Sequence, residues 1–426
     1  MVGQALVCPL PTTLRRMLCV VAAGMVLPAA AAEPTGEATS EVDVVRAALQ
    51  GPVVQHAVEA GQRRARASGT AAPWMPDPIL EARQEQANGP AGNSTQIVGG
   101  SVVLPPGLPG LATHRAAALR EEAGSHWVRV DTVAAVCGVR EATLDLWLAE
   151  ARLARVTDAQ DRLTTLHERS IALARAGEVA GYDRDRLALT VERHRVVVDR
   201  QKRDRAEAVA ALRGWLVDAP QSVTLLPMAE LPALEQAVSD AVAGDPMLQA
   251  LRQEQEAARV SLSAARRGAV PDLTISGGAR WDAMPDGSER TPGYEVGVAV
   301  SLPVFDRNQV AVRGAMADLA ELDARVARRE AEVRAAVELS WAQAESLGPA
   351  IEGTSTDTVW DGARRRYGRG ESSVDELLTV AADVEETELA RLAGVEMRRR
   401  ARLGLACTVG TFPEDSIQTL IEETLR

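Results

Sequence analysis

Five histidines and four cysteines are the side chains of this sequence best suited to catalysis or metal binding. The histidines are scattered, and neither a CxxC motif nor a His/Cys cluster with metal-ligand spacing occurs. Walker, dinucleotide-binding and G-x-S-x-G motifs are also missing from the sequence. We therefore predict no enzyme, no cofactor and no metal site, with histidines on surfaces or helix seams. The histidines are His56, His114, His126, His167 and His194.

The composition narrows the class of protein further. The chain has 426 residues and a net charge of −12, which makes it a poor candidate for binding nucleic acid. Aromatic residues make up 3% and charged residues 25%, a balance that favours long helices with narrow contact seams. No apolar run reaches the roughly 18 residues that a transmembrane helix needs.

The N-terminus has the pattern of a secretory signal peptide. Arg15 and Arg16 supply the positive flank, Met17–Leu27 an apolar run, and Ala30–Ala32 small residues at a cleavage site. We therefore predict a signal peptide at residues 1–32.

The cysteines divide between this segment and the mature chain. Cys8 and Cys19 lie inside the predicted signal peptide, so that only Cys137 and Cys407 remain after cleavage. In an oxidising compartment this pair can form a disulfide, or each cysteine can be an isolated thiol buried in a helix. Their spacing alone does not show pairing, and we favour the isolated thiols.

The stretch from Pro271 to Ala315 predicts a β-hairpin. Apolar and polar residues alternate with a period of two on both sides of a polar, Gly- and Pro-containing loop. We expect strands at about 272–283 and 293–303, and weaker copies at 79–87 and 96–104. A strand of about ten residues is long enough to cross a membrane. The alternating apolar positions are Leu273, Ile275, Ala279 and Trp281, then Tyr294, Val296, Val298, Val300 and Leu302.

Long helical segments flank both hairpins. Residues 112–176 contain no proline and predict one helix of roughly 100 Å. A second helix is expected to return after a glycine-containing turn, and the same order recurs in the second half of the chain. The expected returning helix is 185–216, and its counterparts are 310–366, with a break at Gly348-Pro349, and 374–405. Other helices are expected at 41–67, interrupted at Gly51-Pro52, and at 234–267.

The two halves together predict an internal tandem duplication of about 200 residues. Each half reads as helix, hairpin, long helix, tight turn and returning helix. The predicted domains are a first repeat at 33–219, a linker at 220–232, a second repeat at 233–410 and a polar C-terminal tail at 411–426.

This plan constrains the assembly. Four strands per chain cannot close a membrane barrel, because such barrels need about eight strands and an open edge cannot face lipid. Several chains must therefore share one barrel, and three chains would supply about twelve strands. The narrow apolar seams of the helices likewise need neighbours.

The sequence contains PDL before a predicted strand, SLPVFDRNQ after one, and G-x-x-x-V-D-E-L-L at 370–378. With these three motifs the chain resembles the TolC family of outer-membrane efflux channels. FDRNQ is most similar to the branch that serves heavy-metal and cation efflux pumps of the resistance-nodulation-division (RND) type. The similarity covers about residues 41–408, more strongly in the second half. It implies an α+β membrane protein and homotrimer, with a shared β-barrel in the Gram-negative outer membrane. Antiparallel coiled-coil hairpins would form a periplasmic α-barrel that docks on an adaptor and an inner-membrane RND-type pump.

The resemblance also assigns candidate site residues. Asp375 occupies the position of a family aspartate at the periplasmic entrance, where Glu376 and Glu371 add acidity, whereas Leu378 replaces a second family aspartate. A ring of carboxylates favours cations, although Asp375 and Glu376 also suit an ordinary helix N-terminus. The implied adaptor-contacting tips are Gly177, Glu178, Gly181, Gly368, Gly370 and Ser372. The implied barrel-to-tunnel junction consists of Pro105, Pro303, Asp306, Arg307 and Asn308.

The implied function is the passive exit duct of a tripartite efflux system, exporting metal cations or small toxic compounds. The alternative is a periplasmic coiled-coil adaptor or structural protein without a pore. The recurrence of both hairpins favours the duct, because an adaptor has one helical hairpin. Few aromatic residues lie near the strands, a feature that leaves a shorter or degenerate barrel as an open alternative.

Overall fold

The computed structural model divides the chain into two units, Met1–Glu37 and Ala38–Arg426, and everything below concerns the second unit. The predicted signal peptide lies outside the described residues. These are 38–70, 75–86, 94–105, 108–177, 180–228, 230–283, 290–346, 355–410, 412 and 414–425.

The four expected strands form one antiparallel sheet in the order β2-β3-β5-β6. Its strands are β2 (Ile79–Gln86), β3 (Ser94–Leu104), β5 (Leu273–Ala283) and β6 (Thr291–Val300). The pairing of β3 with β5 joins the two halves of the chain, with Gly99 opposite Gly278. A Cβ on Gly99 would lie 2.6 Å from the Gly277 carbonyl oxygen, so this crossing requires glycine.

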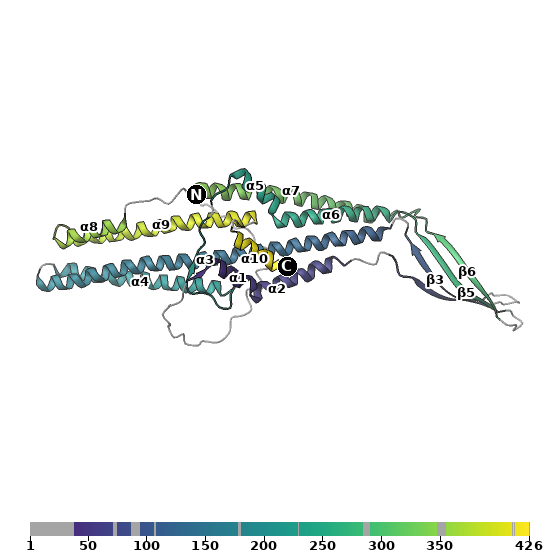
Figure 1. Cartoon of the computed structure of the whole chain (residues 1–426), viewed down its shortest axis with the longest axis horizontal. Coiled ribbons are helices and arrows are strands. Elements are labelled where there is room, and N and C mark those ends of the chain that lie inside the picture. Colours follow the sequence, from purple (N-terminus) through teal and green to yellow (C-terminus); the bar gives the residue numbers. More distant parts are fainter. Residues whose placement is uncertain are drawn as a thin grey trace. The chain divides into compact units, whose positions relative to one another are not determined.

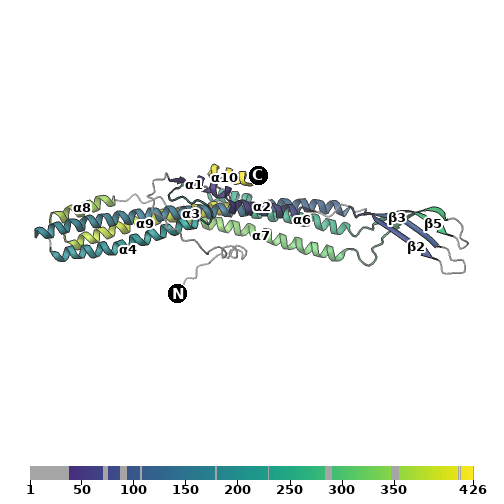
Figure 2. The same ribbon diagram turned by 90° about the horizontal axis from the view of Figure 1, so that it is seen from below.

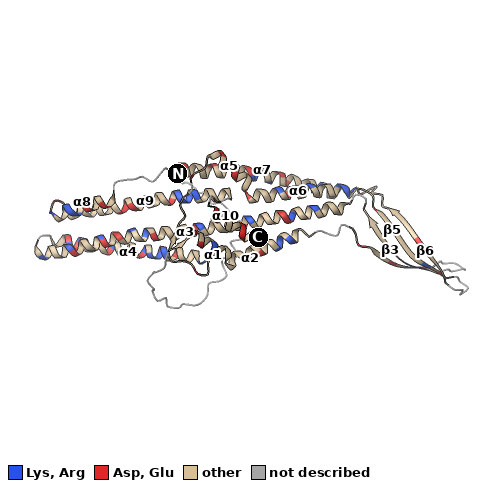
Figure 3. Ribbon diagram, in the orientation of Figure 1, with Lys and Arg blue, Asp and Glu red and all other residues tan. Residues whose placement is uncertain are grey.

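One face of β6 is apolar and exposed. Tyr294, Val296 and Val298 are 87%, 71% and 69% exposed. Figure 3 shows few charged residues along β5 and β6 compared with the helices. Within the described residues, β2 and β6 each have one partner strand, so each leaves one edge of backbone donors and acceptors unpaired.

Two long helices of the first half form an antiparallel hairpin, and the second half has a corresponding pair at its turn. The first pair is α3 (Pro109–Ala176) and α4 (Gly181–Leu212), and the second is α8 (Thr356–Gly368) and α9 (Val374–Val409). The views in Figures 1 and 2 agree that the sheet lies near the start of α3 and that both helix turns lie at the opposite end. None of the helices in the described ranges is long and apolar enough to span a membrane.

The outgoing helix expected at 310–366 is described as two parts, α7 (Gln309–Ser346) and α8. The break expected at Gly348-Pro349 lies outside the described residues. The break expected at Gly51-Pro52 is confirmed, since α1 (Glu41–Gln50) ends there and α2 (Pro52–Ser68) begins.

The helix expected at 234–267 is in fact two helices, α5 (Leu234–Gly244) and α6 (Pro246–Arg267). The side chain of Asp245 caps α6 by accepting a hydrogen bond from the Leu248 backbone at 2.6 Å. Pro246 occupies the first turn of α6, where its missing donor costs nothing. An N-cap followed by proline therefore restarts the helix.

A buried cluster, which we call the central core, unites both termini of the described unit with the middle of α3. It includes Val44 of α1, Val136 of α3, Leu212 of α4 and Val223 of β4 (Val223–Thr224), which pairs in parallel with β1 (Thr39–Ser40). The predicted linker thus contributes a short strand.

The central core also contains α10 (Asp415–Leu425), where the sequence analysis expected a polar tail. That expectation is wrong. Ile417, Leu420 and Ile421 lie on one helical face and are at most 7% exposed. Because this apolar face is short and surrounded by acidic residues, overall polarity concealed it.

A disulfide joins Cys137 of α3 to Cys407 of α9, with their Cα atoms 6.0 Å apart. The favoured interpretation of two isolated thiols is therefore wrong. The cysteines are 270 residues apart in sequence, and only the lateral packing of α3 against α9 brings them together.

Candidate functional site

The predicted tips are two short turns between long helices. Gly177 ends α3 with φ of +78°, a left-handed conformation that glycine adopts without steric cost, and its N–H donates to carbonyl groups of the last turn. Gly181 begins α4. Glu178, predicted as a contact residue between them, lies outside the described residues.

The second turn, between α8 and α9, has comparable local chemistry. Gly368 ends α8, and Gly370 follows with φ of +72°. Ser372 precedes the N-cap residue Ser373, whose hydroxyl oxygen accepts a hydrogen bond from the Glu376 backbone at 3.2 Å. Glycine and serine at these places predict the tight turn correctly.

Each of two predicted entrance carboxylates has an arginine partner. Asp375 at the start of α9 pairs with Arg186 of α4, which connects the two helical hairpins. Glu371 pairs with Arg369 at 3.0 Å, while Glu376 lies beside Asp375 in the first turn of α9. The carboxylate of Asp375 is 60% exposed, so its ion pair contributes little to stability and can exchange partners. The entrance role of these residues stays a prediction.

An apolar cluster supports the two tips. Leu378, at the position of the second family aspartate, packs at its edge as a partly buried residue. The aliphatic side chain therefore extends a hydrophobic contact where a carboxylate would be poorly solvated. The buried members of the cluster are Leu166, Leu187, Trp360, Val374, Leu377 and Val384.

His194 is a buried polar residue that the sequence analysis placed only generally, on a surface or seam. Its Nε2 lies 3.0 Å from a carboxylate oxygen of Glu385 on α9, and its Nδ1 lies 3.2 Å from the amide oxygen of Gln160 on α3. His194 thus connects three helices below the tips. The sequence could have indicated this burial, because His194 lies between Val191 and Val198 on the apolar seam of α4. No cluster of three metal-ligating side chains occurs in the described part of the chain.

The predicted junction residues lie at the opposite end, where β6 leads into α7. Asn308 has φ of +59°, which asparagine tolerates better than most residues. Its backbone N–H donates to the Asp306 carboxylate at 2.9 Å, and its side-chain amide donates to the Ala265 carbonyl oxygen at 2.8 Å. The Arg307 backbone donates to the Gln309 side chain at 2.6 Å. The bond to Ala265 attaches the start of α7 to the end of α6, and the other two bonds order the turn before α7.

The first half has a corresponding connection. The Pro105 carbonyl oxygen, directly after β3, accepts a hydrogen bond from the Leu108 backbone at 2.9 Å, and α3 starts immediately afterwards. Pro303 lies between β6 and α7. In both halves a proline therefore stands where the chain leaves the sheet for a long helix. The structure separates these junction residues from the predicted entrance by the length of the helices (Figure 1).

Long helical hairpins that continue into an antiparallel sheet also form the fold of solved outer-membrane channels. Residues 237–411 match the model of the outer membrane efflux protein family, which confirms the resemblance predicted from the sequence motifs and the outer-membrane location that it implies. No curated protein sequence matches the chain.

Solved channel structures extend the fold to the first half of the chain. CusC is 16% identical with a TM-score of 0.66, and the match covers 87% of this chain and 92% of that one. The CmeC outer membrane channel of Campylobacter jejuni is 14% identical over 94% and 98%, with a TM-score of 0.62. The open MtrE outer membrane channel of Neisseria gonorrhoeae is 17% identical over 87% and 89%, with a TM-score of 0.63. At these identities the likeness establishes the fold.

Proposed function

We propose that this chain is the outer-membrane exit duct of a tripartite efflux system, a passive channel without enzymatic activity. The observation that carries the proposal is the four-stranded sheet, which has two unpaired edges and an exposed apolar face, at the end of long helical hairpins. A sheet of this kind is stable in lipid only when further copies close it. The match to the outer membrane efflux protein family supports the same conclusion.

The surface of α7 supports assembly into a homotrimer. Of its described side chains, only Val333, Val337 and Ala344 are buried within one chain, whereas Val310 and Met316 are 83% and 51% exposed. A helix of this length with so little buried surface needs neighbouring helices. Three copies would supply about twelve strands, within the range of membrane barrels. The parallel organisation of the two halves further suggests that they arose by tandem duplication.

The position of the two helix turns and the resemblance to the TolC family support the proposed partners and cargo. The two glycine-containing turns lie farthest from the sheet, where a periplasmic adaptor and an inner-membrane RND-type pump would meet the duct. The FDRNQ motif suggests metal cations as cargo, and small toxic compounds are the second class. In this proposal the duct itself supplies no energy. The pump drives export and selects the cargo.

Single-channel recording tests the duct. Full-length protein, purified in a non-ionic detergent and added to a planar bilayer, is expected to give stepwise conductance, and native mass spectrometry is expected to show a trimer. Detergent alone serves as the blank. A monomeric product that never conducts would overturn the proposal.

A growth assay separates the cargo classes. A strain that lacks this chain is expected to become sensitive to divalent or monovalent metal cations, and the full chain should restore tolerance. Sensitivity confined to organic toxicants would contradict metal cargo but leave the duct role intact.

A further inference from the structure

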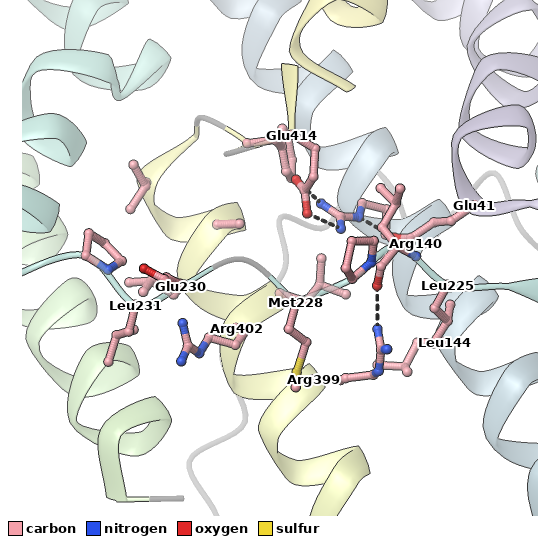
Figure 4. Close-up of a pocket in the computed structure, with 18 of the residues that line it drawn as sticks. Glu41, Arg140, Leu144, Leu225, Met228, Glu230, Leu231, Arg399, Arg402 and Glu414 are labelled. Atoms are coloured by element: carbon pink, nitrogen blue, oxygen red, sulfur yellow. Dashed lines mark hydrogen bonds and ion pairs between the residues drawn. The ribbon is translucent and has the colours of Figure 1, made fainter. Parts of the chain in front are cut away.

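A cavity of about 420 Å³ lies beside the central core, away from both the tips and the sheet. It is lined by α9, by the segment that leads from β4 to α5, by the residues just before α10, and by one or two residues each of α1, α3 and α5 (Figure 4). Its charged lining residues are Glu41, Arg140, Glu230, Asp240, Arg399, Arg402 and Glu414. Most of its wall is apolar. The main apolar contributors are Leu225, Met228, Leu231, Leu403, Val409 and Phe412. Both the volume and the apolar lining are typical of pockets for small organic molecules.

One side of the cavity carries a closed ionic network. Arg140 donates to the Glu41 carboxylate at 2.6 Å and to the Glu414 carboxylate at 3.0 and 3.2 Å (Figure 4). Burial alone would lower the pKa of the Arg140 guanidinium, but both carboxylates outweigh it and the pKa is raised. The second oxygen of Glu41 accepts from the Leu226 backbone at 2.9 Å. These two carboxylates are therefore already engaged.

Arg399 presents a second guanidinium to the cavity with weaker compensation. Its Nη1 donates to the Leu226 carbonyl oxygen at 2.9 Å, and the guanidinium lies 5.5 Å from the ring centre of Trp147. Its Nε is buried and has no hydrogen-bond partner among the described residues. Burial lowers the pKa of the Arg399 guanidinium, Glu41 opposes this shift and Arg140 adds to it. The half-buried Arg399 guanidinium therefore contacts a carbonyl group and an aromatic ring, and no direct ion pair with a carboxylate is seen among the described residues.

We propose that this cavity binds a small organic anion, a carboxylate on a compact apolar body, with Arg399 as the anion-binding residue. A carboxylate in the cavity can accept from the Arg399 guanidinium and add to the partial charge compensation that Glu41 provides. Charge-assisted bonds of this kind are the strong ones. The apolar body would contact the leucine, methionine and phenylalanine walls. The site does not depend on the duct role proposed above, because all its residues belong to one chain.

Isothermal titration calorimetry with two probes of one shape tests the proposal. Naphthalene-2-carboxylate and naphthalene-2-carboxamide differ in charge, and each is titrated into full-length protein in a non-ionic detergent against a detergent blank. The carboxylate is expected to bind roughly tenfold more tightly or better, as a hydrogen bond to a charged group allows. It is also expected to raise the melting temperature of the wild-type protein more than the carboxamide does. Equal affinities for the two probes, or no binding of either, would overturn the proposal.

Two variants with the same change in charge locate the site. Arg399→Gln is expected to abolish the preference for the carboxylate, whereas Arg364→Gln, at an exposed position of α8, should retain it. Met228 lines the cavity and is 44% exposed, so Met228→Trp should narrow the cavity without disturbing the ionic network of Arg140. It should therefore weaken the binding of both probes. An undiminished preference in Arg399→Gln, or unchanged binding in Met228→Trp, would place the anion elsewhere and refute the assignment.

Discussion

The central core and the sheet differ in how far one chain completes them. In the central core, side chains from α1, α3, α4 and α10 bury one another, a disulfide connects α3 to α9, and Arg140 is enclosed with two carboxylates. In the sheet, the apolar face of β6 is exposed and both outer edges lack partners within the described residues. The central core is therefore completed by side chains of one protomer. In the duct proposed above, lipid and further copies would complete the sheet. Substitutions in the central core should accordingly lower the free energy of unfolding, whereas substitutions in the sheet should impair membrane insertion.

The largest effect is expected from Arg140→Met, because the buried Glu41 and the partly buried Glu414 lose their direct ion-pair partner. Breaking a buried ionic network on one side costs about 3–5 kcal/mol. Chemical unfolding followed by tryptophan fluorescence measures the loss. The matched control is Arg46→Met, which removes an exposed ion pair with Asp43 and should cost at most about 1 kcal/mol. Equal losses in the two variants would show that the network is not specially stabilising.

Removal of the disulfide is expected to have the second-largest effect. Cys137→Ser with Cys407→Ser is expected to lower the free energy of unfolding by about 2–4 kcal/mol, because the unfolded chain gains freedom when the link between distant residues is lost. A reductant should reproduce this loss in the wild-type protein and have no effect on the double variant. Insensitivity of the wild-type protein to reductant would contradict the link.

In the sheet, Val298→Arg should impair membrane insertion rather than the central core. An arginine on a lipid-facing position of a barrel costs about 2 kcal/mol or more near mid-depth. Ala299→Arg places the same side chain at the adjacent position on the opposite face of β6, where we expect it to be tolerated. The fraction of folded trimer recovered in the membrane compares the two. The reverse order would assign the faces of the sheet the other way round.

The smallest effect is expected at the tips. Asp375→Asn removes an exposed ion pair with Arg186, so stability should change by less than about 1 kcal/mol. If Asp375 lines the entrance, cation preference should fall, as reversal potentials in a salt gradient would show. Arg186→Gln breaks the same pair but keeps the carboxylate, and it should preserve or increase that preference. Identical shifts in both variants would remove Asp375 from the entrance.

Local patterns of the sequence predicted the elements well. The four strands begin and end within three residues of the expected positions, and α3 begins three residues before its expected start. Period-two alternation and proline-free helical runs act over neighbouring residues, so each can be recognised without the rest of the fold. The helix turns could be predicted for the same reason. Gly177 caps the end of α3 and Ser373 caps the start of α9, and each cap acts on neighbouring residues.

The sequence by itself therefore determined two β-hairpins, the long helices beside them, and motifs specific enough to indicate an outer-membrane efflux channel. Only the tertiary structure decided that Cys137 meets Cys407, that Arg140 is enclosed by Glu41 and Glu414, and that α10 belongs to the central core. Each of these contacts joins side chains far apart in sequence, and no local periodicity reports such a distance. The cavity beside Arg399 has the same origin, because its walls come from segments that meet only after the long helices pack.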